Sequence, residues 1–162
     1  MKKRVGVYPL IPCGKCKFCD TGHPEMCRDY DYMGSRRNGA FAENVAVPAS
    51  NLIELPESVS YEAAAMLEPM AVAVHVMRMA LDNGAHVNRD AKIVICGLGT
   101  IGLLLLSFLM ERGYKEIFVV GKSDGQRKRA AGLGLAEDHY CDYKAAETAA
   151  WICDRTEGGA EV

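Results

Sequence analysis

The sequence lacks a marked excess of either charge. Its 162 residues include 19 Lys and Arg against 21 Asp and Glu, which gives a net charge of −2 at pH 7. Nucleic acids and anionic membranes attract proteins through accumulated positive charge, so no global field recruits either partner here. An apolar fraction of 49% and a charged fraction of 25% indicate a globular chain rather than a disordered one. We therefore expect a small-molecule ligand, with neither nucleic acid nor membrane as a partner.

Long hydrophobic runs are also missing. An apolar stretch such as residues 101–106 is far shorter than the roughly 20 residues that a membrane span requires. The basic start MKKR is followed by VGVYPLIPCGKC, which has neither the sustained apolar segment nor the small-residue cleavage site of a signal peptide. These absences predict a cytoplasmic protein. In that compartment, seven cysteines indicate metal ligation or free thiols rather than disulfides.

Four of the cysteines lie within the fifteen residues CGKCKFCDTGHPEMC, with the spacing C-x2-C-x2-C-x7-C. Two residues between thiolates allow a tight turn to direct both sulfurs at one ion, and a longer return closes a tetrahedron. Zn²⁺ binds four thiolates in this way, and such a closed site has no open position for chemistry. The predicted ligands of a structural zinc are Cys13, Cys16, Cys19 and Cys27.

Other readings of this cluster fit less well. An iron–sulfur site would need a shorter last gap and a proline after the final cysteine, whereas here the gap is seven residues and Arg28 follows. A nucleic-acid zinc finger would place a recognition helix after the site, but residues 28–48 indicate turns and strands. Within them, residues 39–48 alternate apolar and polar side chains and predict a half-exposed strand. Four free thiols are the remaining alternative.

A glycine-rich turn follows a short apolar run at residues 93–96, which is typical of a buried parallel strand. The motif G-x-G-x-x-G then opens an apolar, helix-length segment, and a second strand is predicted at residues 116–120. In this context the glycines allow a tight turn, and the helix N-terminus offers N–H groups to a pyrophosphate. The predicted pyrophosphate residues are Gly97, Gly99, Thr100, Ile101 and Gly102. The alternative is a glycine turn that serves packing alone.

The end of the second strand indicates which nicotinamide cofactor is bound. An acidic residue there would bind the ribose hydroxyls of NAD, but this chain has Gly121, followed by Lys122 and Ser123. A cation and a hydroxyl suit the 2′-phosphate of NADP, so NADP is favoured over NAD. The alternative is that Asp124 serves as the ribose acid on a shifted loop.

Together the two motifs, with the glycine turn about seventy residues after the zinc cluster, resemble the zinc-containing alcohol dehydrogenases of the medium-chain dehydrogenase/reductase superfamily. The segments VYPLIPCGKC, YMGSRRNGAFAENVAVP and AAAMLEPMAVAVH are most similar to polyol dehydrogenases of the sorbitol dehydrogenase and galactitol-1-phosphate 5-dehydrogenase type. The resemblance implies an α/β chain. Residues 1–60 would form the C-terminal part of a β-rich GroES-like catalytic domain with a zinc lobe at 13–27. Residues 61–89 would be a crossover helix region, and residues 90–162 the first half of a Rossmann domain.

The same resemblance implies an activity. The family transfers a hydride between NADP(H) or NAD(H) and a secondary alcohol, a polyol or a sugar-alcohol phosphate, with a second, catalytic zinc as Lewis acid. Glu68 matches the residue that approaches this catalytic zinc, and the Arg36–Arg37 pair is a candidate for binding a phosphorylated sugar. The remaining zinc ligands and the nicotinamide half have no counterpart here. We therefore expect a middle piece of a longer enzyme, dimeric or tetrameric like its relatives, which would be inactive alone. The alternative is a non-catalytic zinc- and nucleotide-binding module.

Several local features also follow from the sequence. Ser60 is a predicted helix cap, and Pro69 is expected to interrupt the helical stretch after it. The cysteines outside the cluster are expected to be small buried hydrophobes on strands or a helix, namely Cys96, Cys141 and Cys153. The methionines of the helical stretch are expected in the core, namely Met66, Met70, Met77 and Met79.

Overall fold

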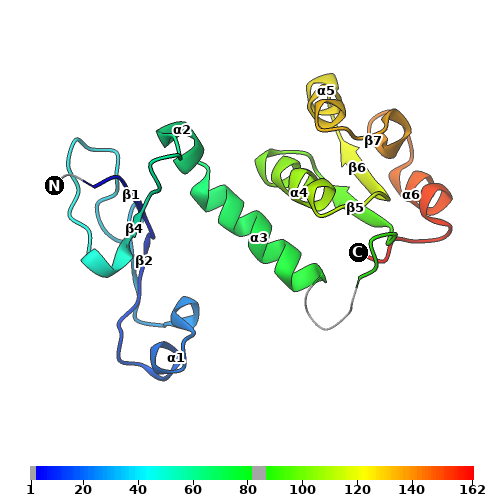
Figure 1. The fold of residues 1–162 in the computed structure, drawn as a ribbon. Helices are drawn as coiled ribbons and strands as arrows, with labels where there is room; N and C mark the ends of the chain where they lie inside the picture. The colour runs from blue at the N-terminus through cyan, green and yellow to red at the C-terminus, as the bar shows by residue number, and fades with distance from the viewer. Residues whose placement is uncertain (1–2, 82–86) are drawn as a thin grey trace. The chain divides into compact units, whose positions relative to one another are not determined.

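The computed structural model describes residues 3–81 and 87–162, and the chain divides into two compact units, Met1–Ala65 and Met66–Val162. The portions of the predicted ranges 1–60 and 61–89 that fall on residues 1–2 and 82–86 lie outside the described residues. Figure 1 shows the order of the elements along the chain. No helix among the described residues has the length and apolar character needed to cross a membrane.

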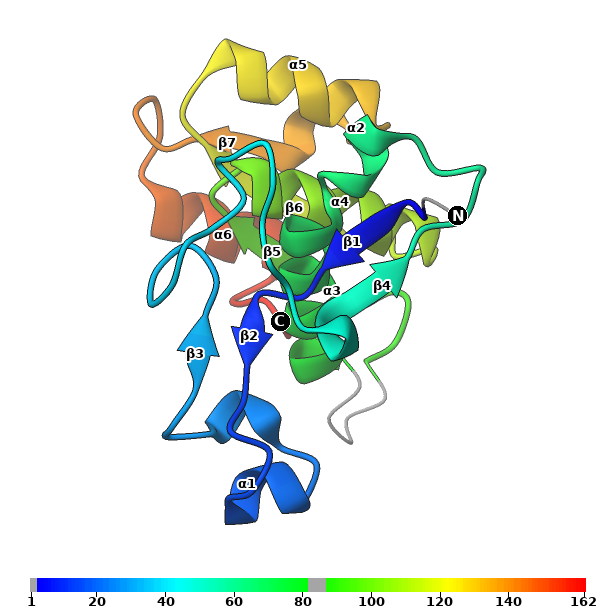
Figure 2. The same cartoon turned by 90° about the vertical axis from the view of Figure 1, so that its left-hand side faces the viewer.

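The described part of the first unit is built on two short antiparallel pairings. β1 (Val5–Val7) pairs with β4 (Leu52–Glu54), and β2 (Leu10–Ile11) pairs with β3 (Asp31–Tyr32). The zinc lobe is inserted between β2 and β3 and contains α1 (Lys17–Asp20) and the 3₁₀ turn η1 (Pro24–Met26), as Figure 2 shows.

A buried asparagine holds the base of this unit together. Asn51, which is 5% exposed, ends the 3₁₀ turn η2 (Ala49–Asn51) just before β4. Its Nδ2 atom donates hydrogen bonds to the carbonyl oxygens of Tyr8 at 2.8 Å and Leu10 at 2.7 Å. A buried polar group is tolerated when it is bonded in this way, and here it ties the chain between β1 and β2 to the start of β4.

The strand predicted at residues 39–48 is not present. The backbone there is irregular, and the side chain of Phe41 is fully exposed. Alternation of apolar and polar residues makes a strand only where a neighbouring strand accepts its backbone hydrogen bonds, and no described strand pairs with this segment.

The chain passes from the first unit to the second at a short break between helices. α2 (Tyr61–Ala64) closes the first unit, and the Ser60 hydroxyl accepts a hydrogen bond from the Ala63 N–H at 3.1 Å, which confirms the predicted cap. α3 (Leu67–Leu81) begins the second unit. The interruption predicted at Pro69 is wrong, because this proline lies in the first turn of α3, where its missing N–H has no intrahelical partner to lose.

The described part of the second unit contains a parallel sheet in the order β5-β6-β7, with strands Ile93–Cys96, Ile117–Gly121 and Tyr140–Asp142. The connecting elements are α4 (Thr100–Glu111), α5 (Asp124–Gly132) and η3 (Glu137–His139), and α6 (Thr148–Thr156) follows β7. β5 and β6 confirm the two strands predicted from the sequence at residues 93–96 and 116–120.

Helices cover both faces of this sheet, as a buried parallel sheet requires (Figure 1). On one face, Ile117 and Val119 of β6 pack into a core that includes Leu106 of α4 and Met77 of α3. On the other face, the ring of Phe118 meets Trp151 of α6 edge-to-face, with 6.0 Å between centroids. Alternate residues of one buried strand thus contact helices on opposite sides.

The last residues pair with the free edge of β5. The Val162 N–H donates to the Lys92 carbonyl at 3.4 Å, and the Val94 N–H donates to the Val162 carbonyl at 2.9 Å, in the pattern of a parallel ladder. β5 therefore lies between β6 on one side and residue 162 on the other. This is a topological switch point, where sheets of this type bind ligands beyond the carboxyl ends of the strands.

The cysteines outside the zinc cluster and the methionines of the helical stretch were predicted to be buried, and this prediction is only partly confirmed. Cys141 in β7 is buried, but Cys96 and Cys153 are exposed. Cys96 is the last residue of β5, at the carboxyl end of the strand, and Cys153 lies in α6, where Thr156 is the buried residue. Of the four methionines expected in the core, Met77 is buried and Met66 half-buried, whereas Met70 and Met79 are exposed.

Candidate zinc and dinucleotide sites

The structure brings the four predicted zinc ligands together. Their Sγ atoms all lie within 4.8 Å of one another, and the sulfur of Cys19 is 4.0 Å from that of Cys13 and 3.5 Å from that of Cys16. Four sulfurs at about 2.3 Å from a tetrahedral zinc are about 3.8 Å apart, so the donor set fits this ion. Gly14 and Gly22 carry the left-handed turns of the lobe, with φ of 70° and 79°.

Backbone hydrogen bonding and burial shift the pKa values of two of these thiols in opposite directions. A hydrogen bond from the backbone of Cys19 lowers the pKa of Cys16 to about 7, whereas burial raises the pKa of Cys19 to about 11. The N–H of Cys13 is also 3.4 Å from the sulfur of Cys27. Without a cation, adjacent thiols cannot all ionise, and a divalent ion supplies the charge that stabilises four thiolates together.

The glycine turn has the conformation that the motif predicts. Gly97 has a φ of 99°, and Gly99 is the N-cap residue of α4. A Cβ atom on Gly102 would lie 2.1 Å from the carbonyl oxygen of Gly97, so this third glycine allows α4 to pack closely against the end of β5. Thr100 and Ile101 form the first turn of α4, whose N–H groups have no partner within the helix.

A cavity of about 340 Å³ opens at the carboxyl ends of β5 and β6. It is lined by Gly97, Leu98, Gly99, Val120, Gly121, Lys122, Gln126 and Tyr143. The structure thus joins the first two motif glycines to Gly121 and Lys122, which were predicted to face the adenosine ribose. Gln126 and Tyr143 were not predicted. Their only signal is position, one turn into α5 and just after β7, because both places border the carboxyl edge of a parallel sheet.

The loop between β6 and α5 is held by its own side chains. The N–H of Lys122 donates to Gln126 Oε1 at 2.8 Å, and Ser123 caps α5 by accepting the Gln126 N–H at 3.3 Å. Ser123 is exposed beside this cavity but is not part of its lining. Asp124, the alternative ribose acid, begins α5 and also does not line the cavity.

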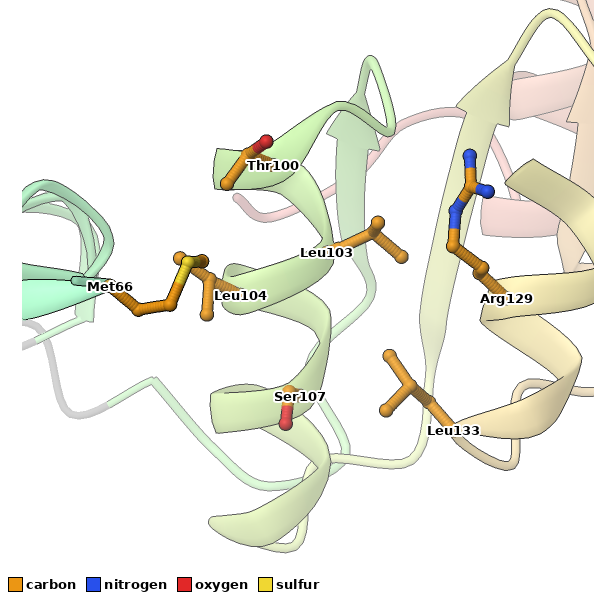
Figure 3. A pocket seen from close by; sticks show the side chains of 7 residues that line it. All are labelled: Met66, Thr100, Leu103, Leu104, Ser107, Arg129 and Leu133. Carbon is orange, nitrogen blue, oxygen red and sulfur yellow. The ribbon is translucent and has the colours of Figure 1, made fainter. Parts of the chain in front are cut away.

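A second cavity, of about 470 Å³, lies between α4, α5 and the start of α3, and its lining residues are shown in Figure 3. Leu103 and Leu133 point into the space between the two helices, and Thr100 stands at its edge. The side chain of Thr100 therefore lines this largely apolar cavity rather than the glycine-lined one. Its predicted contribution to the pyrophosphate site is confined to its backbone N–H.

Glu68 lies in the first turn of α3 with an exposed side chain. In the described ranges, the four cysteines form the only group of three or more side chains placed to hold a metal ion. No set of catalytic-zinc ligands is therefore gathered around Glu68 in this part of the chain.

Arg36 and Arg37, the candidates for binding a phosphorylated sugar, both contact nearby residues of their own segment. The Arg36 guanidinium lies 4.0 Å from the ring centroid of Tyr30 and donates to the Tyr30 carbonyl at 3.0 Å. Arg37 pairs with Asp31, with 2.8 Å between Nε and Oδ2. These contacts give both residues a role in shaping the turn that follows β3.

Comparison with known proteins agrees with this geometry. Residues 3–57 match the alcohol dehydrogenase GroES-like domain. The chain is 34% identical over 133 residues to galactitol 1-phosphate 5-dehydrogenase of Escherichia coli K12, an alignment that covers 82% of this chain and 37% of that protein. It is 33% identical over 132 residues to L-idonate 5-dehydrogenase of Vitis vinifera, covering 81% and 35% respectively.

The solved structures that resemble this chain are also dehydrogenases. Galactitol-1-phosphate dehydrogenase from Escherichia coli superposes with a TM-score of 0.70 at 33% identity, covering 82% of this chain and 37% of that one. A zinc-binding dehydrogenase from Sinorhizobium meliloti bound to NADP superposes with a TM-score of 0.79 at 26% identity, covering 91% and 41%. An alcohol dehydrogenase of Escherichia coli complexed with NADH has a TM-score of 0.73 at 27% identity, covering 88% and 40%.

The chain is therefore homologous to the zinc-containing alcohol dehydrogenases, and its fold combines a GroES-like portion with an α/β portion built on a parallel sheet. Within that class, the polyol dehydrogenases named above are among its relatives, as the sequence predicts. The chain spans about 37% of the length of the curated relatives it matches.

Proposed function

We propose that this chain provides the structural zinc site and the adenosine-binding half of the cofactor site of a zinc-dependent dehydrogenase. The observation that carries the proposal is the cavity at the switch point, where Gly97 and Gly99 meet Gly121 and Lys122. Relatives named for the oxidation of galactitol 1-phosphate and L-idonate support a secondary alcohol, polyol or sugar-alcohol phosphate as the substrate of the whole protein.

Each group has a distinct role in this proposal. The glycine turn and the first turn of α4 bind the pyrophosphate, while Lys122 and Ser123 meet the ribose end of the cofactor. The bound nicotinamide would carry the hydride, and a catalytic zinc would polarise the alcohol oxygen. Glu68 is the residue of this chain proposed to approach that zinc. Its remaining ligands are not among the described residues.

NADP is the proposed cofactor, with NAD as the alternative. The cavity presents Lys122 and no carboxylate, because Gly121 stands at the end of β6 and Asp124 lies outside the lining. A 2′-phosphate carries two negative charges, which a lysine attracts and an acidic residue repels.

Binding of the adenosine halves of the two cofactors, here called half-cofactors, tests this proposal directly. 2′,5′-ADP and 5′-AMP differ only in the 2′-phosphate, so calorimetric titration of the chain with each isolates its contribution. We expect 2′,5′-ADP to bind about tenfold more tightly, since one charge-assisted contact contributes about 1.4 kcal/mol, and Lys122→Ala to abolish the difference. Lys115→Ala, at an exposed lysine preceding the other end of β6, is the matched control. Tighter binding of 5′-AMP would contradict the NADP preference, and binding of neither would contradict the dinucleotide site.

We also propose that the protein acts in the cytoplasm as a homo-oligomer, a dimer or a tetramer. All seven cysteines lie in the described ranges and none of them forms a disulfide there, which suits a reducing compartment. The oligomer follows from the family resemblance, and light scattering on the purified protein measures it.

A further inference from the structure

Tyr140 is a buried side chain beside the cofactor cavity that neither the glycine motif nor Lys122 explains. It is 6% exposed and lies in β7, where its Cα pairs with that of Val119. Alternate residues of a strand share a face, so Tyr140 stands on the same face of the sheet as Gly121. A Cβ atom on Gly121 would lie 2.2 Å from the Tyr140 hydroxyl oxygen, 2.7 Å from Cζ and 2.9 Å from Cε2. The ring thus fills the space in which a side chain at position 121 would begin.

The ring is held where it is. Its hydroxyl donates a hydrogen bond to the Ser123 carbonyl at 3.1 Å and is 3.4 Å from the Ser123 N–H, from which it accepts. The Arg127 guanidinium lies 5.1 Å from the ring centroid. The same hydroxyl that occupies the space over Gly121 therefore anchors the backbone of the loop that carries Lys122 and Ser123.

In NAD-binding proteins of this fold, the acid that binds the ribose stands at the end of the second strand, which is the position of Gly121. We propose that Tyr140 sets the choice between NADP and NAD as a positioning residue. Its ring excludes an acidic side chain from position 121, and its hydroxyl holds Lys122 and Ser123 where a 2′-phosphate would bind. Tyr140 does not line the cavity, so it acts through its neighbours. This inference rests on the proposed function, because it assumes that the cavity receives the adenosine ribose.

The test uses the same two probes, 2′,5′-ADP and 5′-AMP, with the ratio of their affinities as the readout and thermal unfolding as a control on folding. Gly121→Asp alone is expected to lower the melting temperature and weaken both probes by at least about tenfold, because the new side chain collides with a fixed ring. In Gly121→Asp/Tyr140→Val the ring is gone. This variant is expected to regain 5′-AMP binding and to reverse the preference, since the carboxylate bonds the ribose hydroxyls and repels the 2′-phosphate.

Tyr140→Phe separates the two roles of the side chain. Phenylalanine keeps the Cζ atom, so Gly121→Asp/Tyr140→Phe is expected to remain blocked. Tyr140→Phe alone keeps the bulk but loses both bonds to Ser123. We expect it to fold, to bind 5′-AMP as before, and to lose about three- to tenfold of its preference for 2′,5′-ADP, since a hydrogen bond contributes about 0.5–1.5 kcal/mol.

The outcomes distinguish this inference from the function on which it rests. If the unaltered chain binds neither probe, the dinucleotide site itself is wrong and the role of Tyr140 is rejected with it. If the unaltered chain prefers 2′,5′-ADP but Tyr140→Phe leaves the ratio unchanged, only the role of Tyr140 is rejected. The same holds if Gly121→Asp alone folds normally and binds 5′-AMP in preference.

Discussion

Replacing Cys19 with serine is expected to release the zinc and unfold the lobe between β2 and β3, while the second unit remains folded. The lobe has almost no core of its own, because α1 and η1 contribute no buried residue and Met26 is 55% exposed. Its fold must therefore be held by the metal, and structural zinc sites in small domains contribute about 10–16 kcal/mol of apparent binding free energy. The core of the second unit is formed by its own residues, such as Leu106 and Val119, and does not depend on the lobe.

Zinc content and local protection measure this effect. The unaltered chain should contain one zinc ion by elemental analysis, and Cys19→Ser should contain less than about a tenth of that, since the site loses one of its four thiolates. Proteolysis and amide exchange should increase within residues 13–27 and stay unchanged in β5, β6 and β7. Cys153→Ser, at an exposed cysteine of α6, is the matched control and should retain the ion. Full retention of zinc by Cys19→Ser would exclude the four-thiolate site.

The second large effect is expected at the third glycine of the motif. In Gly102→Ala the added methyl group would stand 2.1 Å from the Gly97 carbonyl oxygen and 3.1 Å from its carbon, both backbone atoms of the turn. The start of α4 must therefore move away from β5. We expect a loss of about 3 kcal/mol in the free energy of unfolding, at the upper end of the usual cost of overpacking, and loss of half-cofactor binding by at least about a hundredfold.

Gly132→Ala provides the matched comparison. This glycine lies in α5, and nothing lies within 4 Å of the position its Cβ would take. Alanine there should leave binding unchanged and raise the free energy of unfolding by about 0.5–1 kcal/mol, because alanine is the better helix former. Denaturant titration of both variants measures the difference. Equal stability of the two would mean that the close packing of α4 on β5 does not constrain position 102.

Features that depend on neighbours in the chain could be predicted from the sequence. The zinc ligands follow from spacing, because cysteines separated by two residues in a tight turn can direct their sulfurs at one ion. The Gly97 turn and the Ser60 cap follow from local backbone chemistry in the same way. The buried strands of the second unit were visible as apolar runs because both of their faces are covered.

Features that depend on distant neighbours were decided only by the tertiary structure. Residues 39–48 have the alternation of a strand, yet no described strand pairs with them. Cys96 and Cys153 are of a residue type that is usually buried, yet both are exposed. Burial depends on which face of a strand or helix is covered by another part of the fold. Thr100 belongs to the motif, yet its side chain lines a different cavity.

The contact between Gly121 and Tyr140 shows the same division most clearly. From the sequence, Gly121 is only the absence of an acidic residue at the end of a strand. The tertiary structure shows why no side chain fits there, since the ring that occupies its place belongs to the next strand, nineteen positions further along. The cysteine cluster and the glycine turn could be predicted from the sequence, and the cofactor site was proposed from it, because these features are local. The pairing of strands determined the shape of that site, because only a folded sheet brings these two residues into contact.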